Sequence, residues 1–365
     1  MMRSGASTEL PQGVTWSREF NAVSSLAAVS SRIAASVVIA SKPALVGIDA
    51  GGRLTWQREV PATGLIIAGV SSVFAAIAGD ITVIDPADGS VGARREADPP
   101  PGGWTQATAL AIGDDLLVAD AQGVERVRAV DLHTLWKVTP ALGEQNDTIQ
   151  QLVHEPPWIG AVSNHTVMVI SEGGELNWKR ALPADIRLAG DRPLVLADQR
   201  MWVGLVKESD PRVRYLYEVS VSDGSLESET PIDDLAMFCP AYASGGVLVV
   251  DTQRGLAGFD IVTGLKRRWS IDAPVALGTC IRQDGHLVVA TRHGELLRVS
   301  LADGGTETII GLPRKPVWVA PAPDISPGVH SESTGEIEHL LSLPGGVAFS
   351  VSWSADRAAL QFRRW

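Results

Sequence analysis

The fold of this chain is decided by the stretch Leu45-Val-Gly-Ile-Asp-Ala-Gly-Gly-Arg-Leu-Thr-Trp56. Apolar residues alternate up to Asp49, two glycines follow, and a second extended run carries Trp56. Alternation with a period of two is typical of a strand with one face on a core and the other toward water. Glycine tolerates positive φ, so the glycine pair between the runs predicts a tight antiparallel turn. The stretch therefore predicts a β-hairpin.

Variants of this hairpin recur along the chain. An acidic or hydroxyl residue closes the first strand of each copy, and we take it as the anchor. The anchors are Asp49, Asp85, Asp131, Ser171, Ser220, Asp260 and Ser300. Their spacings are 36, 46, 40, 49, 40 and 40 residues. Self-similarity at roughly 40–45 residues, built from strands and turns, is typical of the four-stranded blades of a β-propeller.

A tryptophan marks the second strand of several copies, with basic residues beside it. These tryptophans are Trp56, Trp136, Trp178 and Trp269. A large flat ring on an outer strand can cover the groove between neighbouring sheets, where smaller side chains would leave voids. We interpret these tryptophans, and the recurring Asp49, Asp85, Asp131 and Asp260, as structural features of the blades rather than as a catalytic site.

The two ends of the chain share one blade in this interpretation. Val14–Phe20 resembles the second strand of a hairpin, with Trp16 in the place of Trp56, but no first strand precedes it. Three strands are expected near the C-terminus, over 337–343, 346–353 and 357–365. The N-terminal strand would complete this last blade and remove the two edges of an open ring. We therefore predict an all-β propeller of eight four-stranded blades, with seven as the alternative because the third and fifth units are the least regular.

The bulk properties fit one repeat domain with no nucleic-acid or membrane partner. We expect a flexible segment over 1–13 and a single propeller domain over 14–365, with a long loop insertion at 313–338. The net charge is −11 and 45% of the 365 residues are hydrophobic. Nucleic-acid binding draws on a basic surface, which an acidic chain does not favour. The sequence has no 18-residue apolar segment and starts without a secretory pattern, so we expect a cytoplasmic protein.

Residues that could carry chemistry are sparse. Cys239 and Cys280 are 41 residues apart, about one repeat, and we expect two buried free thiols at the same strand position of neighbouring blades, with a disulfide between them as the alternative. His286 and His293 flank one expected strand, and we interpret them as turn residues rather than as a metal pair. The nucleotide, hydrolase and zinc motifs that can be recognised from sequence are not present. We therefore expect no catalytic residue, no metal and no cofactor.

The hairpin resembles the repeat of the quinoprotein-like propellers. The matches with the clearest pattern are Asp49–Trp56, Asp85–Gly89 and Asp260–Trp269. This family includes quinone-dependent alcohol dehydrogenases and noncatalytic outer-membrane assembly lipoproteins. The dehydrogenases carry adjacent cysteines beneath the quinone and a calcium ion, whereas Cys239 and Cys280 are not adjacent and no Asp-x-Asp calcium loop occurs. The resemblance therefore implies a noncatalytic member, similar in size to the lipoproteins but without their signal and lipidated cysteine.

These observations predict a noncatalytic, monomeric scaffold for protein–protein interaction, and a multi-component bacterial assembly is one context that fits. The alternative is an enzyme or small-ligand sensor that uses the central channel. The candidate partner-binding loop is 313–338, where we single out Trp318, Ile325 and His330. An exposed aromatic side chain within a polar rim can anchor an interface. The identity of the protein partner is left open.

Overall fold

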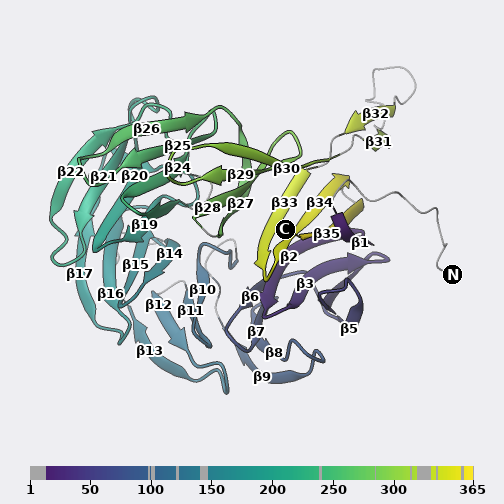
Figure 1. The fold of residues 1–365 in the computed structure, drawn as a ribbon. Helices are drawn as coiled ribbons and strands as arrows, with labels where there is room; N and C mark the ends of the chain where they lie inside the picture. Colours follow the sequence, from purple (N-terminus) through teal and green to yellow (C-terminus); the bar gives the residue numbers. More distant parts are fainter. Residues whose placement is uncertain are drawn as a thin grey trace, which may run out of the picture.

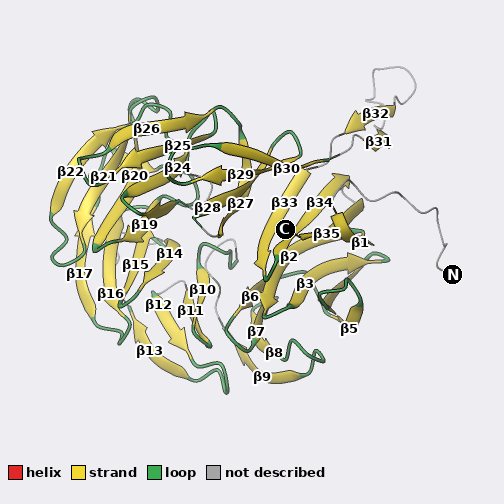
Figure 2. Ribbon diagram, in the orientation of Figure 1, coloured by secondary structure: helices red, strands yellow, loops and turns green. Residues whose placement is uncertain are grey.

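Eight antiparallel blades form a ring in the computed structural model of this chain (Figure 1). The structure describes residues 14–97, 99, 103–120, 123–139, 147–237, 241–283, 285–312, 315–318, 330–333, 336–354 and 357–364. Every regular element in these ranges is a strand (Figure 2). In the same ranges no helix is long and apolar enough to cross a membrane. The prediction of an all-β propeller with eight blades is confirmed, and the seven-bladed alternative is wrong.

Blades 1 to 4 each consist of four consecutive strands, with the first strand at the centre of the ring. Blade 1 contains β2 (Ala22–Val29), β3 (Arg32–Ile39), β4 (Lys42–Ile48) and β5 (Leu54–Glu59). Blade 2 contains β6 (Leu65–Ala68), β7 (Val73–Ile77), β8 (Asp80–Ile84) and β9 (Val91–Glu96). Blade 3 contains β10 (Ala109–Ile112), β11 (Asp115–Ala119), β12 (Val124–Val127) and β13 (Thr134–Val138). Blade 4 contains β14 (Ile149–Glu155), β15 (Trp158–Ser163), β16 (Thr166–Ser171) and β17 (Leu176–Ala181).

Blades 5 to 7 continue this order, but the central strand of blade 5 is broken in two. Blade 5 contains β18 (Ile186–Leu188), β19 (Leu194–Ala197), β20 (Arg200–Lys207), β21 (Arg214–Ser220) and β22 (Leu226–Pro231). Blade 6 contains β23 (Tyr242–Ser244), β24 (Val247–Asp251), β25 (Leu256–Asp260) and β26 (Lys266–Ile271). Blade 7 contains β27 (Val275–Gln283), β28 (His286–Thr291), β29 (Glu295–Ser300) and β30 (Thr306–Gly311).

Blade 8 is built from both ends of the chain. It contains β33 (Glu336–Leu343), β34 (Gly346–Ser354), β35 (Arg357–Arg364) and, as its outer strand, β1 (Val14–Phe20). Strand β1 pairs antiparallel with β35, so that Trp16 lies opposite Phe362 and Phe20 opposite Ala358. The predicted closure by the N-terminal strand is therefore confirmed. Between blades 7 and 8, β31 (Lys315–Trp318) and β32 (His330–Ser333) form a separate two-stranded sheet.

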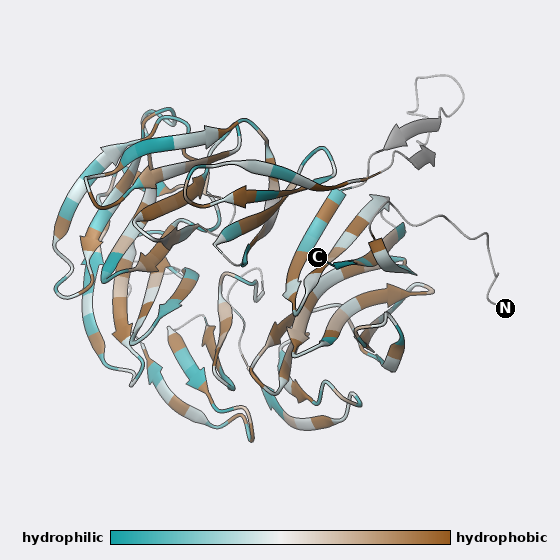
Figure 3. Cartoon of the chain, viewed as in Figure 1, coloured by the Kyte–Doolittle hydropathy of each residue, from teal (hydrophilic) through white to brown (hydrophobic). Residues whose placement is uncertain are grey.

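The core lies between the blades rather than within any one of them. Hydrophobic residues recur along the strands (Figure 3) and form clusters that combine residues of neighbouring blades. One cluster, for example, joins Phe20 and Leu360 of blade 8 to Val23 and Ile48 of blade 1. Cys280 is buried, as expected, whereas Cys239 lies outside the described residues. A blade buries its apolar faces only when a neighbour stands on each side.

Each tryptophan of the repeat reaches across the boundary between two blades, which we call a seam. Its ring lies on a turn glycine of the next blade: a Cβ added to Gly89 would be 2.6 Å from the Trp56 ring. The indole N–H of Trp56 donates to the carbonyl of Pro86 at 3.1 Å. Arg58 adds a second hydrogen bond, to the Gly89 carbonyl at 3.1 Å. The same ring-on-glycine contact joins Trp16 to Gly52, Trp136 to Gly174, Trp178 to Gly224 and Trp269 to Gly304.

The aspartates of the repeat stabilise the turns. Asp49 Oδ1 accepts hydrogen bonds from the backbone N–H groups of Gly51 and Arg53, both at 2.9 Å. Asp85 accepts one from Ala87, and Asp260 accepts two, from Val262 and Thr263. A carboxylate that binds backbone N–H groups in this way fixes the turn. These contacts place Asp49, Asp85 and Asp260 at one position of three blades.

The third hairpin is aligned differently from our expectation. The backbone of Arg128, not that of Asp131, makes the two turn hydrogen bonds that Asp85 makes in blade 2. Asp131 corresponds to Asp88, and both carboxylates accept from the N–H two residues later. The Arg128 guanidinium also binds Asp131 and holds the pKa of that carboxyl at about 2. We assigned the anchor to Asp131 because this turn lacks the glycine that marks it in the other copies. Leu132, with a φ of 55°, takes the place of that glycine.

We predict that Gly89→Ala destabilises the protein more than Gly264→Ala does. Both glycines lie in hairpin turns with positive φ (72° and 92°), so both substitutions carry a backbone cost of roughly 1–2 kcal/mol. The new methyl group of Gly89→Ala would also clash with the Trp56 ring, whereas no atom lies within 4 Å of a Cβ at Gly264. Overpacking should add about 1–3 kcal/mol to the loss at Gly89.

Urea denaturation of both variants would measure this difference. In a Trp56→Ala background the excess cost of Gly89→Ala should vanish. Equal losses for the two single variants would show that the ring-on-glycine contact is not tight.

Candidate functional site

The candidate functional site is the channel at the centre of the ring. Its wall is formed by the first strand of each blade, which contacts the first strands of its neighbours at most seams. These strands are β2, β6, β10, β14, β18 with β19, β23, β27 and β33. Several of them have a register shift, so that one residue at the shift can turn toward the adjacent blade.

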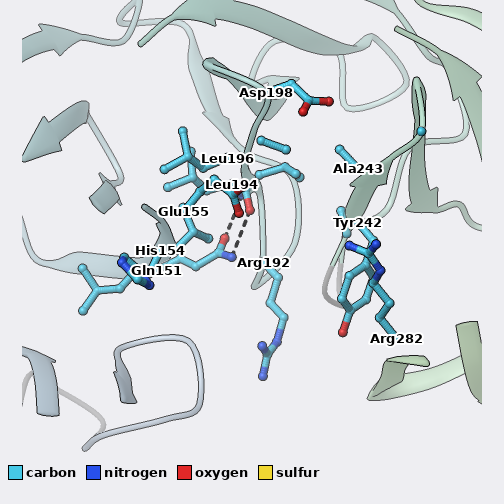
Figure 4. A pocket seen from close by; sticks show the side chains of 16 residues that line it. Gln151, His154, Glu155, Arg192, Leu194, Leu196, Asp198, Tyr242, Ala243 and Arg282 are labelled. Carbon is cyan, nitrogen blue, oxygen red and sulfur yellow. Dashed lines mark hydrogen bonds between the residues drawn. The ribbon is translucent and has the colours of Figure 1, made fainter. Parts of the chain in front are cut away.

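Polar side chains at these register shifts join neighbouring blades. Ser25 Oγ on β2 accepts a hydrogen bond from the backbone N–H of Ile66 on β6 at 3.0 Å. Gln151 on β14 forms two bonds with the backbone of Leu194 on β19: its Oε1 accepts at 2.7 Å and its Nε2 donates at 3.1 Å (Figure 4). The buried Gln151 amide thus acts like one rung of a β-ladder between two sheets. These side chains hold neighbouring blades together, and they also line the hollows of the channel.

His339 takes the same role where blade 8 meets blade 1. It occupies the register shift of β33 and is hydrogen-bonded to the backbone of Val23 on β2. Burial disfavours the charged imidazolium and lowers the pKa of His339, although the bond to Val23 acts in the opposite direction. Its neighbour Glu338 has a raised pKa because desolvation outweighs a hydrogen bond from Ser352.

A hollow of about 370 Å³ opens where the central strands begin. It is lined by Ser25, Gln106, Arg192, Glu338 and His339, among others. Arg192 Nη2 donates to the side-chain oxygen of Gln106 at 3.4 Å. Because these residues come from blades 1, 3, 5 and 8, the ring must be closed before this hollow exists.

Arg192 is positioned by the break in the central strand of blade 5. The segment between β18 and β19 contains Gly190, whose φ is +74° and whose added Cβ would come within 2.4 Å of the Ala236 carbonyl. The backbone N–H of Arg192 donates to the carbonyl of Met237 at 2.9 Å, which ties the segment to blade 6. Only glycine permits this close approach, and the approach directs Arg192 into the channel (Figure 4).

A second hollow, of about 560 Å³, lies beyond Arg192. Arg192 also lines this space, with Arg282 of β27, Tyr242 of β23 and His154 of β14 (Figure 4). The Tyr242 hydroxyl donates to the backbone carbonyl of Cys280 at 3.1 Å, and His154 Nε2 lies 2.6 Å from Glu172 Oε1. Arg282 also lines a third hollow, of about 590 Å³, together with Leu343.

This arrangement is suited to binding an anion rather than to a recognisable reaction. Arg192 and Arg282, from different blades, line one hollow, and guanidinium is the group that best matches carboxylate and phosphate oxygens. Glu155 and Asp198 line the same hollow, so its charge is mixed. No set of three or more His, Cys, Asp or Glu side chains able to hold a metal ion is found in the part of the chain that the structure describes.

Two of the three predicted partner-binding residues lie on β31 and β32, outside the ring (Figure 1). Trp318 on β31 is paired through its backbone with His330 on β32, in the separate hairpin. Ile325 falls outside the described residues. His286 begins β28 and His293 follows its end, so both lie at the turns where we expected them.

The channel residues were missed from the sequence. Arg192, Arg282 and His154 belong to no motif and are far apart along the chain. The length of the fifth repeat, 49 residues between anchors, was no signal for Arg192, because most of the additional residues lengthen the hairpin of β20 and β21 rather than the broken central strand. His339 could not have been assigned a role, because its bond to Val23 depends on the closure of the ring.

We predict that His339 makes the protein less stable as the pH falls below about 6.5. The folded-state pKa of His339 is lowered from its ordinary value of 6.5, so the unfolded chain binds the proton more readily. The stabilising effect of the neutral imidazole is present above pH 6.5 and is lost as the pH falls toward the folded-state pKa. The free energy of unfolding should fall by at most about 1.4 kcal/mol for each pH unit on this account.

The His339→Gln variant keeps a side-chain N–H for Val23 but cannot titrate. Unfolding free energies measured between pH 7 and pH 5 should therefore fall less for this variant than for the wild type. Glu338, with its raised pKa, opposes the trend and is common to both proteins. Parallel pH profiles for the two proteins would contradict the assignment.

Comparison with known proteins supports the fold. No protein-family model matches the sequence, and no curated protein matches it. Among solved structures, BamB from Moraxella catarrhalis is similar, with a TM-score of 0.60 and 12% identity over 96% of this chain and 99% of that chain. The computationally designed Ika8 protein is similar with a TM-score of 0.64 and 10% identity, over 97% and 98% of the two chains.

A europium-containing methanol dehydrogenase is also similar, with a TM-score of 0.67 and 12% identity over 96% of this chain and 93% of that chain. At these identities the likeness is one of fold. The resemblance to quinoprotein-like propellers is therefore supported at the level of architecture, by neighbours that include an enzyme.

Proposed function

We propose that this protein is a noncatalytic scaffold whose task is to bind another protein. The observation that carries the proposal is the hairpin of β31 and β32, which pairs with none of the eight blades as far as the chain is described. Figure 1 shows the hairpin outside the ring. Two paired strands are marginally stable alone, and each outer edge is a template for a further strand. A partner segment that adds to such an edge is a common mode of peptide recognition.

The ring itself supports this reading. Five of its seams have a tryptophan contact, and its last blade is closed by β1. It therefore needs no partner to complete its core and can act as a rigid support. The hairpin, by contrast, contributes no strand to any blade among the described residues and carries two of the predicted anchor residues, Trp318 and His330.

We predict that replacing 315–333 with a short Gly-Ser linker removes partner binding and spares the fold. The flanking strands β30 and β33 remain, so the melting temperature should stay within about 2 °C of the wild type. As a matched control, 208–212 in the β20–β21 connection would be replaced in the same way, and this variant should bind the partner normally.

The partner would be identified by a photo-crosslinking residue placed at Val317 in the otherwise unchanged protein. The crosslinked protein should be retained by the wild type and by the 208–212 control, and lost from the hairpin variant. Retention by the folded hairpin variant would refute this role for the hairpin.

A second candidate function is binding of a small anionic ligand in the channel, as an enzyme or a sensor would require. The observation in its favour is the pair Arg192 and Arg282 on one hollow. We expect a panel of di- and tricarboxylates and phosphate esters to leave the melting temperature unchanged under the scaffold hypothesis. If one of these ligands raised the melting temperature of the wild type but not that of Arg192→Gln, the channel rather than the hairpin would be the functional site. The same would follow from stoichiometric binding of a quinone with calcium.

A further inference from the structure

The hollow of about 370 Å³ at the start of the central strands, which we call the first hollow, carries one charge of each sign. Its volume is near the lower end of the range for small-molecule sites, roughly 300–1,000 Å³. Among the described residues that line it, Arg192 and Glu338 are the charged side chains. Burial lowers the pKa of His339, so its imidazole is neutral at pH 7 and adds no third charge.

The two charges enter the first hollow from different sides of the ring. Arg192 belongs to blade 5, between β18 and β19, and Glu338 belongs to β33 of blade 8. Arg192 Nη2 donates to the side-chain oxygen of Gln106 at 3.4 Å. A guanidinium has five N–H groups, so this contact leaves it able to bind a carboxylate as well. Glu338 is exposed and Arg192 is partly exposed, so a ligand can reach both.

The surroundings of Glu338 favour an incoming cation. Desolvation and the charge of Glu336 raise the pKa of Glu338, and a hydrogen bond with Ser352 is the one influence that lowers it. No cation of the described residues contributes to this balance. A cation placed beside Glu338 would therefore stabilise its ionised form, whereas an anion would be repelled.

Trp104 and Leu65 give the first hollow an apolar part of its wall. Both pack in the cluster of buried side chains between blades 2 and 3. The indole N–H of Trp104 also donates to the carbonyl of Ala119 at 3.1 Å, which fixes the position of the ring. These two side chains offer apolar surface to the hydrocarbon part of a ligand, as is typical of small-molecule sites.

We propose that the first hollow binds a small zwitterion, with its ammonium group at Glu338 and its carboxylate at Arg192. Ligands with these two groups at opposite ends of a short hydrocarbon chain include ω-amino acids and short peptides. A carboxylate forms charge-assisted, bidentate bonds with a guanidinium. A ligand that is only an anion would leave Glu338 without a partner, and one that is only a cation would leave out Arg192, so neither matches the hollow.

This inference goes beyond the scaffold function, because the site uses no residue of the hairpin of β31 and β32. It also differs from the anion site of the second candidate function. That site is the hollow of about 560 Å³, which Arg192 lines together with Arg282 and which Glu338 does not line.

The test compares three ligands that share one hydrocarbon chain. The probe is 5-aminopentanoate, pentanoate carries only the negative charge, and pentylamine carries only the positive charge. Binding at pH 7 is followed through the indole N–H signals of the isotope-labelled protein, which has 11 tryptophans. The signal of Trp104 is assigned with the variant Trp104→Phe.

We expect 5-aminopentanoate to shift the Trp104 signal and to bind at least about tenfold more tightly than either other ligand, because each of those loses one charge-assisted contact. In Glu338→Gln the advantage over pentanoate should vanish, and in Arg192→Gln the advantage over pentylamine should vanish. Glu336→Gln is the matched control. Glu336 lies two residues from Glu338 on the same strand but lines a separate hollow, so this variant should keep the preference of the wild type.

Each comparison is made between ligands on one variant, so a partial loss of folded protein lowers both affinities and leaves their ratio unchanged. The proposal is overturned if 5-aminopentanoate does not shift the Trp104 signal, or if the three ligands bind the wild type equally. It is also overturned if Glu338→Gln keeps the full preference or if Glu336→Gln loses it. The variant with 315–333 replaced should bind 5-aminopentanoate as the wild type does, and a loss there would contradict a site independent of the hairpin.

Discussion

Each blade of this ring depends on its neighbours, because a single four-stranded sheet has two apolar faces and no means of covering them alone. The clusters of buried side chains combine residues from adjacent blades, as at the boundary of blades 3 and 4, where Leu117 and Ala119 pack with Ile159 and Ile170. The seam is therefore the unit on which stability depends, and the ring must close so that no face is left without a partner. The tryptophan contacts and the wall of the channel are both properties of seams.

Two kinds of polar contact complete the seams, one on the outside of the ring and one beside the channel. On the outside, an indole N–H and a guanidinium bind carbonyls of the next turn, and both contacts use side chains that also cover apolar surface. Near the channel, Ser25 and Gln151 bind the backbone of the next central strand. The inner contacts use a short hydroxyl and an amide whose two ends are both hydrogen-bonded, so they fix the register of neighbouring blades at the wall of the channel.

The sequence predicted the parts of the fold that depend on local chemistry. The alternation, the Asp-Gly turns and the tryptophan of each hairpin lie within about 12 residues of one another, and they were sufficient to count eight blades and to place β1 beside β35. The third hairpin was misaligned because Leu132 takes over the space of both a turn glycine and a tryptophan, a substitution that only the neighbouring Ala93 explains. The channel residues could not be predicted, because Arg192, Arg282 and His339 meet only through the curvature of the whole ring.

The seams of the ring differ in how far apart along the sequence their two sides lie. Most seams join segments that follow each other along the chain; Trp178, for example, binds the carbonyl of Val221, 43 residues later. Blade 8 is different, since β1 and β35 are at opposite ends, and Gln361 Nε2 donates to Ser17 Oγ across 344 residues. Closing a longer loop costs more conformational entropy, but only slowly with length, so the penalty for this last pairing is moderate. The pairing of β1 with β35 has a larger effect on the order in which the blades form. Blades 1 to 7 can assemble in sequence, whereas blade 8 forms only when both ends of the chain meet. The contact of His339 with Val23 and the mouth of the channel form at the same step.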